Sequence, residues 1–280
     1  ILKERKYVII NFLIIIQGKM IKILIKDRKL IWELAKNDCK ARFSSSILGV
    51  VWTILQPLIN MLVIWLVFQV GFKSSNLSGD IPFIIWYMPA FLIWNYFQEA
   101  TSQATNSLLE YSYLVKKVNF DVEVIPPIKV VSNALIHFFF IFFIIFVNLC
   151  YGKMPTIYYL QVIYYLFCTA VFSLAIGWLC SAIAPFAADI SNIISIIIQL
   201  GFWITPIFWD PSALTDTAAF FMKMNPMYYI CMGYRDCFVY DVPFYEHPVL
   251  MTYFWIVTIV IWLIGTRLYK KAKAHFDDVL

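Results

Sequence analysis

Charged residues are scarce in this sequence. Only 14% of its 280 residues are charged, whereas 62% are hydrophobic, and the mean hydropathy is +0.76. A soluble domain has about a quarter of its residues charged and about half of them apolar. The composition therefore excludes a soluble globular domain and a disordered chain. It predicts a membrane protein with room for about six spans of roughly 20 residues.

Nucleotide-binding loops and clustered catalytic groups are missing as well. The nine glycines form neither a P-loop nor a dinucleotide-binding pattern. Within the apolar stretches the main titratable groups are Glu99 and His137, whereas a membrane enzyme needs several clustered groups. We expect a carboxylate near the headgroups for Glu99 and a neutral interhelical hydrogen bond for His137, with functional roles as the alternatives. No catalytic residue and no cofactor are predicted on this chain.

Cysteine pairs with metal-ligand spacing are also absent. The six cysteines show no C-x-x-C pattern, which argues against a metal site or a disulfide framework. The net charge of +5 is no sign of nucleic-acid binding, because the basic residues are placed asymmetrically in the way that membrane orientation produces.

Long apolar stretches are what the sequence does contain. The six stretches are residues 43–72, 81–98 with a continuation to about 109, 130–152, 154–188, 190–209 and 249–266. Each is about as long as a bilayer-crossing helix. Barrel strands alternate apolar and polar residues, and runs such as 138–146 do not. The predicted fold class is an all-α polytopic membrane protein with six transmembrane helices.

Lysine and arginine are distributed unevenly along the chain. Eleven precede the first stretch, three lie between the second and third, four follow the last one, and only four lie elsewhere. Because these residues accumulate in cytoplasmic loops, both termini and the second-to-third connection are predicted to be cytoplasmic. Six spans agree with two termini on the same side.

A basic amphipathic helix is predicted at residues 28–43, in the cytoplasmic interface of the membrane. Its apolar face comprises Leu30, Ile31, Leu34 and Ala35. Asp38 and Arg42 fall on the same side, four residues apart, so they can pair. Residues 1–27 are a basic N-terminal extension to which no fold is assigned, and Met20 is a natural start.

A second unusual segment, residues 210–247, is predicted outside the membrane. It is rich in aromatic residues and is interrupted by Pro211, Pro226 and Pro243. We expect short re-entrant helices between spans five and six. Arg235, beside Asp236, has two interpretations: a structural pair with Asp236 or Asp210, or a fork that binds an anionic group of a substrate.

Two aromatic stripes keep helical spacing, and either lines a path for sugar rings or packs helices together. The first includes Trp65, Phe68 and Phe72, and the second includes Tyr158, Tyr165 and Phe172. In the cytoplasmic segment 108–120, Leu114 and Val118 are candidate anchors for a partner, with Lys116 and Lys117 as rim charges. A plain solvated loop is the alternative.

Two sets of motifs resemble those of ABC exporter permeases of the polysaccharide and polyol-phosphate class. The first, in residues 30–58, comprises Asp38, Lys40, Arg42, Ser46, Leu48, Gly49, Trp52 and Pro57. The second comprises Thr205, Pro206 and Trp209 of the run TPIFW, then Asn225, Pro226, Tyr234 and Arg235. Phe43 departs from the pattern, in which tyrosine is common.

The resemblance covers residue 28 to the end of the chain and implies an exporter transmembrane domain over residues 28–280. It implies a homodimer in the cytoplasmic (inner) membrane bound to two ATPase subunits, which would carry the ATP and magnesium. The substrate would be a lipid-linked glycan such as O-antigen, capsule or teichoic acid, moving along an aromatic channel between the protomers. Residues Asp38 and Arg42 and the 108–120 segment would then couple to the ATPase, and the second motif set would form an outer gate.

Three alternatives stay open on the sequence alone. A permease of the same fold that exports a drug or a lipid has the same span pattern. A membrane glycosyltransferase or acyltransferase would show clustered carboxylates or histidines at one membrane face. A non-transporting scaffold would not need the outer re-entrant segment.

Overall fold

The regular structure of the protein is helical. The computed structural model describes residues 20–44, 49–71, 81–116, 120–211 and 215–279, and these ranges contain no β-strand. The longer helices are α2 (Arg28–Ser44), α3 (Gly49–Leu66), α4 (Phe83–Glu110), α6 (Ile125–Cys150), α7 (Val162–Ser181), α8 (Asp189–Ile204) and α11 (Pro248–Ala272). The shorter ones are η1 (Val67–Gly71), α5 (Ser112–Val115), η2 (Val122–Val124), η3 (Ile157–Gln161), α9 (Asp216–Lys223), α10 (Pro226–Arg235), η5 (Asp236–Tyr240), η6 (Phe244–Glu246), η7 (Lys273–His275) and α12 (Phe276–Val279).

Each of the six apolar stretches contains one long helix. Four helical segments are long and apolar enough to cross a membrane: Val51–Gly71, Val122–Cys150, Ile157–Ser181 and Pro248–His275. Helix α8 is apolar but shorter. Helix α4 has 28 residues, and its second half carries polar side chains that lower its hydropathy. The structure thus bears out a polytopic, all-helical membrane protein.

Helix α4 is the central helix of the bundle and packs against α6, α7, α8 and α10. Its first half is buried on nearly every side, which fits its aromatic sequence. Helices α4 and α7 come very close together at Gly177, where an added Cβ would lie 2.7 Å from the Cβ of Ala104. At Gly233 of α10 an added Cβ would lie 2.1 Å from the ring of Tyr165 in α7. Small residues therefore fix the spacing of the central helices.

Helices α3 and α8 lie at the periphery of the bundle. Only 6% of the apolar window in Val51–Gly71 is buried, and only Ile194 and Ile198 are buried in α8. Their apolar side chains face outward, as expected for helices that meet lipid or another protein chain.

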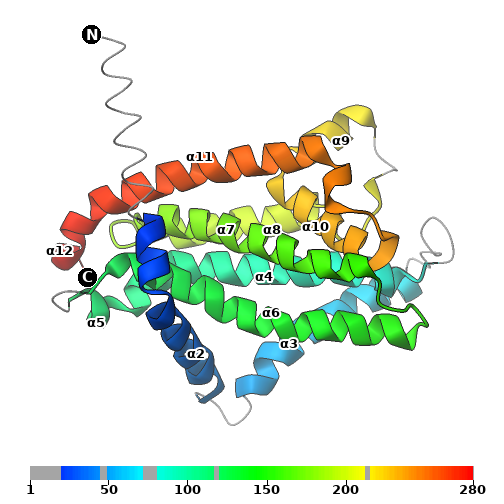
Figure 1. Cartoon of the computed structure of the whole chain (residues 1–280), viewed down its shortest axis with the longest axis horizontal. Helices are drawn as coiled ribbons and strands as arrows, with labels where there is room; N and C mark the ends of the chain where they lie inside the picture. The colour runs from blue at the N-terminus through cyan, green and yellow to red at the C-terminus, as the bar shows by residue number, and fades with distance from the viewer. Residues whose placement is uncertain (1–19, 45–48, 72–80, 117–119, 212–214, 280) are drawn as a thin grey trace.

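The two ends of the bundle carry different elements. Helices α5 and α12 lie at one end, and α9 and α10 lie at the other (Figure 1). Helix α2 leaves the bundle axis obliquely and packs on α6 (Figure 1). Residues 20–26, within the predicted N-terminal extension, form a helical turn that packs through Met20 and Ile23.

The predicted amphipathic helix is present as α2, but its buried face is rotated. Ile31 and Ala35 are buried as expected, whereas Leu30 is 41% exposed. Asp38 and Cys39 continue the buried stripe instead. The stripe follows the i, i+4, i+7 and i+8 positions from Ile31, so the polar side chain of Asp38 enters the interior.

The segment predicted to be re-entrant does contain short helices, namely α9, α10 and η5. Helix α9 has no buried residue, whereas nearly all of α10 is buried against α4, α7 and α11. Asn225 caps α10, since its side chain accepts a hydrogen bond from the amide of Met227, and Pro226 occupies the first turn.

Candidate functional site

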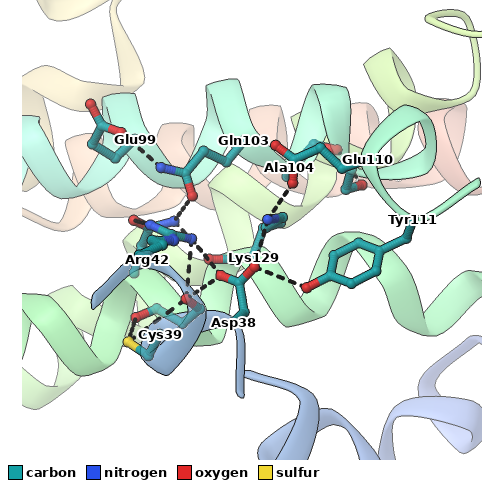
Figure 2. Close-up of polar contacts among 12 residues, drawn as sticks. Asp38, Cys39, Arg42, Glu99, Gln103, Ala104, Glu110, Tyr111 and Lys129 are labelled. Carbon is teal, nitrogen blue, oxygen red and sulfur yellow. Dashed lines mark hydrogen bonds and ion pairs between the residues drawn. The ribbon is translucent and has the colours of Figure 1, made fainter. Parts of the chain in front are cut away.

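A buried polar cluster fastens α2 to the spanning helices (Figure 2). We call it the inner cluster; it comprises Asp38, Arg42, Tyr111, Lys129 and Ser132. Lys129 lies 2.6 Å from one oxygen of Asp38, and Tyr111 donates to the same oxygen at 2.9 Å. Arg42 and Ser132 each donate to the other oxygen at 2.6 Å. Both oxygens of this carboxylate are therefore satisfied by donors from α2, α6 and the α4–α5 junction.

The inner cluster holds Asp38 in its charged form. Burial alone would raise the pKa of Asp38, but hydrogen bonds from Lys129 and Ser132 and the nearby charges of Arg42 and Lys129 lower this pKa to about 2. Lys129 also pairs with Glu110 at the end of α4. An aspartate with these partners joins helices rather than titrating near neutral pH.

A chain of hydrogen bonds leads from the inner cluster along α4. Arg42 donates to the side chain of Asn133 at 3.0 Å, and Asn133 donates to Gln103 at 2.9 Å. Gln103 in turn donates to Glu99 at 2.8 Å (Figure 2). Glu99 is thus an exposed carboxylate that these hydrogen bonds link to the inner cluster. Its position near the headgroups stays a prediction.

The predicted pairing of Asp38 with Arg42 is confirmed. Both residues were proposed to couple to an ATPase, yet Asp38 is only 7% exposed. They thus face the interior of this chain, and any coupling through them passes along α2. Lys129 was missed as their partner because it lies at the start of an apolar helix, ninety-one residues from Asp38, and no local spacing connects the two.

The predicted docking segment forms the end of α4 and the short helix α5. Leu114, the predicted anchor, is buried within this chain at 8% exposure, because it lies on the inner side of α5. Tyr113 is 59% exposed and Leu109 is 42% exposed. Lys116 is exposed, as a rim charge should be, whereas Lys117 and Val118 lie outside the described residues.

The second motif set comes together at the C-terminal end of α8 and the start of α10. We call this the outer cluster; it comprises Trp86, Thr205, Ile207, Asn225 and Arg235. Thr205 accepts a hydrogen bond from the side chain of Asn225 at 2.7 Å. Pro206 is buried beside Thr205, and Trp209 donates to the carbonyl of Trp203 at 3.3 Å.

Arg235 lies at the centre of the outer cluster and is fully buried. Its guanidinium donates to the carbonyl of Trp86 at 3.1 Å and to that of Ile207 at 2.6 Å, and lies 3.5 Å from the centre of the Trp86 ring. Of the two acidic neighbours considered as partners, Asp236 lies 3.2 Å from His247 instead, whereas Asp210 supplies a nearby negative charge. Carbonyl oxygens and an aromatic face compensate the cation, so it fastens helices and is not open to a substrate anion.

His137 makes the predicted interhelical hydrogen bond. Its Nε2 atom lies 3.0 Å from the hydroxyl oxygen of Tyr234, which joins α6 to α10. Tyr234 was predicted as part of the outer gate, and it is fully buried against this histidine.

The two aromatic stripes differ in their surroundings. Tyr165 and Phe172 are buried; Tyr165 packs on Tyr229, and Phe172 stacks on Phe97. In this conformation these two residues pack helices and line no open path. Tyr158, Trp65 and Phe68 are partly exposed, and Phe68 also stacks on Phe83. Phe72 lies outside the described residues.

The match to known proteins covers most of the chain. Residues 29–239 match the family described as ABC-2 type transporter. The chain belongs to this family. It is accordingly a multi-pass membrane protein, the membrane subunit of an ABC-2 type transporter.

Relatives of this ABC-2 type transporter chain are known in two bacteria. The O-antigen export system permease protein RfbA of Myxococcus xanthus is 26% identical over 267 residues, which cover 93% of this chain and 98% of the relative. The protein of the same name from Klebsiella pneumoniae is 25% identical over 252 residues, which cover 88% of this chain and 93% of the relative. The similarity therefore extends over about nine-tenths of this chain and over nearly the whole of each relative.

Three adjoining hollows follow the face that α3, α4 and α8 form in this transporter chain. The first, of about 270 Å³, lies between α3, α4 and α6 and includes Arg42, Glu99 and His137 in its lining. The second and third, of about 270 and 320 Å³, continue toward α8. Gln98 lines all three hollows. Amide side chains recur in the lining of all three hollows, and the sequence analysis did not single them out.

The polar residues of α4 do carry a signal in the sequence. Asn95, Gln98, Ser102 and Asn106 recur every three or four residues in α4, and so lie on one face of that helix. Among the residues that the structure describes, no three His, Cys, Asp or Glu side chains are arranged to hold a metal ion.

Proposed function

We propose that this chain is the permease subunit of an ATP-driven exporter that moves a lipid-linked cell-surface polysaccharide across the cytoplasmic (inner) membrane. The observation that carries the proposal is the similarity to O-antigen export permeases over about nine-tenths of the chain. The polar hollows beside α4 support it, because a hydrophilic substrate needs polar groups within the membrane region. An exporter of a drug or a lipid with the same fold is the alternative, and an apolar hollow of about 740 Å³ between α2, α6, α7 and α11 is the observation that favours it.

In this proposal six helices span the membrane, namely α3, α4, α6, α7, α8 and α11. The α5 end is cytoplasmic, and α9 and α10 face the outside. Two copies of the chain associate, and the outward apolar faces of α3 and α8 are the surfaces best suited to that contact. The test is labelling with an impermeant thiol reagent in a cysteine-free background. Tyr245→Cys should react in whole cells and Lys116→Cys only after lysis; reaction of Lys116→Cys in whole cells would overturn the topology.

The energy would come from a separate ATPase subunit that holds ATP and magnesium, since the sequence of this chain contains no phosphate-binding loop. We place its docking surface at α5 and the end of α4, where Tyr113 and Leu109 expose apolar area at the bundle end opposite α10. The inner cluster would then transmit movement of this end to α2 and α6. The chain purified without its partner should hydrolyse no ATP.

The docking surface is tested with a matched pair of exposed tyrosines. Tyr113→Asp should abolish co-purification of the ATPase, because an exposed aromatic anchor contributes about 2 kcal/mol or more to such contacts. Tyr245→Asp, on η6 at the other end of the bundle, should leave it unchanged. Equal ATPase recovery with both variants would remove α5 from the docking surface.

The export function itself is tested by deleting the gene and measuring polysaccharide at the cell surface and lipid-linked polysaccharide inside. Loss at the surface with accumulation inside is expected. Normal surface polysaccharide in the deletion strain would overturn the proposed function.

A further inference from the structure

A row of amide side chains connects the three hollows. We call it the amide seam; it comprises Gln56, Asn60, Asn95, Gln98 and Gln199. Asn60 and Asn95 line both the first and second hollows, and Gln199 lines the third. Gln98 adjoins every one of them. The row therefore passes from α3 across α4 to α8.

The seam has unused hydrogen-bonding capacity. Within the part of the chain that the structure describes, the side chains of Gln56, Asn60, Gln98 and Gln199 make no hydrogen bond to protein, and all are at least partly exposed. Each amide offers two donors and an acceptor. An amide that faces hydrocarbon without a partner is costly, so this face meets water or other polar groups rather than lipid tails.

The first hollow contains a further group without a partner. His137 lines the hollow and is only 2% exposed, and its Nδ1 atom is buried with no hydrogen-bond partner among the described residues. Buried polar atoms are nearly always paired, so an unpaired one beside a polar hollow points to a water or ligand group there.

The charges of the three hollows are few and do not favour an anion. Among the described residues that line them, the cation is Arg42, which is already bonded to Asp38 and Asn133. The carboxylate is Glu99, which is exposed. A phosphate group in the seam would leave water without a counter-cation and would lie near this carboxylate.

We propose that the amide seam binds a hydroxyl-rich, uncharged stretch of the exported polymer, such as successive hexose rings, and discriminates against a polyol-phosphate backbone. The inference rests on the proposed export function and narrows its substrate class. Sugar hydroxyls both donate and accept hydrogen bonds, as amides do, so each ring meets complementary groups without a buried charge. A site built from such groups penalises a ligand that leaves them unpaired.

The seam is tested by binding to the purified full-length chain in lipid nanodiscs, followed by tryptophan fluorescence, since Trp52 and Trp94 line the hollows. The probes are maltoheptaose and a glycerol-phosphate heptamer. Maltoheptaose should bind, and Gln98→Leu and Asn60→Leu should each weaken it about fivefold, as expected for the loss of one hydrogen bond. Gln69→Leu is the matched control, because this amide lies in η1 and lines none of the three hollows.

Tighter binding of the glycerol-phosphate heptamer, no binding of maltoheptaose, or equal binding by Gln98→Leu and the wild type would each overturn the seam. Export measurements separate this failure from failure of the proposed function. Deletion of the gene could remove surface polysaccharide while the Gln98→Leu and Asn60→Leu variants, expressed in the deletion strain, restore it fully. This result would support the proposed export function and contradict the role of the amide seam. If deletion leaves the surface polysaccharide unchanged, the proposed export function itself is contradicted.

Discussion

The inner and outer clusters both bury a cation among helices, but they compensate it differently. In the inner cluster Lys129 and Arg42 meet the carboxylate of Asp38. In the outer cluster Arg235 meets two carbonyl oxygens and the face of Trp86. The stability of the inner cluster therefore depends on charge balance, whereas the stability of the outer cluster depends on the shape of the guanidinium group.

This difference also separates the tasks of the two ends. The inner cluster joins α2 to α6 and to the α4–α5 junction, so it connects three elements at the proposed ATPase side. The outer cluster joins α4 and the end of α8 to α10. Removing a charge should damage the first most, and altering geometry at constant charge should damage the second most.

The largest effect is expected from Lys129→Met. The substitution leaves Asp38 buried with one cation fewer, and breaking a buried pair in this way costs about 3 kcal/mol or more. The midpoint of thermal unfolding, followed by size-exclusion chromatography in detergent, should fall strongly. Lys116→Met, which removes an exposed lysine, serves as the control and should change stability by less than about 0.5 kcal/mol. Equal midpoints for the two variants would show that the inner cluster does not depend on charge balance.

The next effect tests geometry at constant charge. Arg235→Lys keeps the positive charge, but a compact ammonium cannot reach the carbonyls of both Trp86 and Ile207 while covering the indole ring. We expect a loss of about 2 kcal/mol in the same unfolding measurement. Arg267→Lys, at an exposed position of α11, should have almost no effect. Full stability of Arg235→Lys would contradict the shape argument.

The sequence predicted what local spacing or composition determines. Helix α2 and the Asp38–Arg42 pair follow from residues four apart, and the helical outer segment follows from its proline breaks. Two partners of Arg235 are main-chain carbonyls, those of Trp86 in α4 and of Ile207 just after α8, and no side-chain pattern encodes a carbonyl oxygen. Of the pairings considered for Arg235, the one with Asp236 is not formed, because adjacent residues on a helix point in different directions.

The docking segment and the hollows show a second limit of prediction from the sequence. Leu114 and Tyr113 differ in burial because of how α5 sits on the bundle, and the sequence, which left a plain solvated loop open in this segment, does not determine that difference. Aromatic stripes were given more weight than amides as path residues, yet Tyr165 and Phe172 pack in the core. The amides of α4 were recognisable by spacing, whereas their meeting with Asn60 and Gln199 required the tertiary structure.

The inner cluster should also show a pH dependence that the outer cluster lacks. The pKa of Asp38 is lowered from its ordinary value near 3.8 to about 2. Because this pKa is lowered, the ionised Asp38 contributes roughly 2 kcal/mol to the free energy of unfolding above about pH 4. This contribution is lost as the pH falls toward 2. Unfolding midpoints at pH 6 and pH 3 should therefore differ less for Asp38→Asn than for the wild type. The same pH difference in both would assign the acid sensitivity to other carboxyl groups.

The smallest effect is expected from the hydrogen bonds of Asn225, which test how much single hydrogen bonds contribute to the stability of the outer cluster. The Asn225 side chain accepts from the amide of Met227 and donates to Thr205, so it caps α10 and ties it to the end of α8. Asn225→Ala removes both functions and should cost about 1 kcal/mol, the usual value of a helix cap. Asn225→Asp keeps the cap acceptor but removes the donor to Thr205, and should therefore cost less than Asn225→Ala. Thr205→Val removes the other partner of the same bond together with the bond that Thr205 donates to Gly201, so adding Asn225→Asp to Thr205→Val should cost little beyond Thr205→Val alone. Additive losses would show that Asn225 and Thr205 act independently, and the outer cluster would then be held by Arg235 and not by the motif pair.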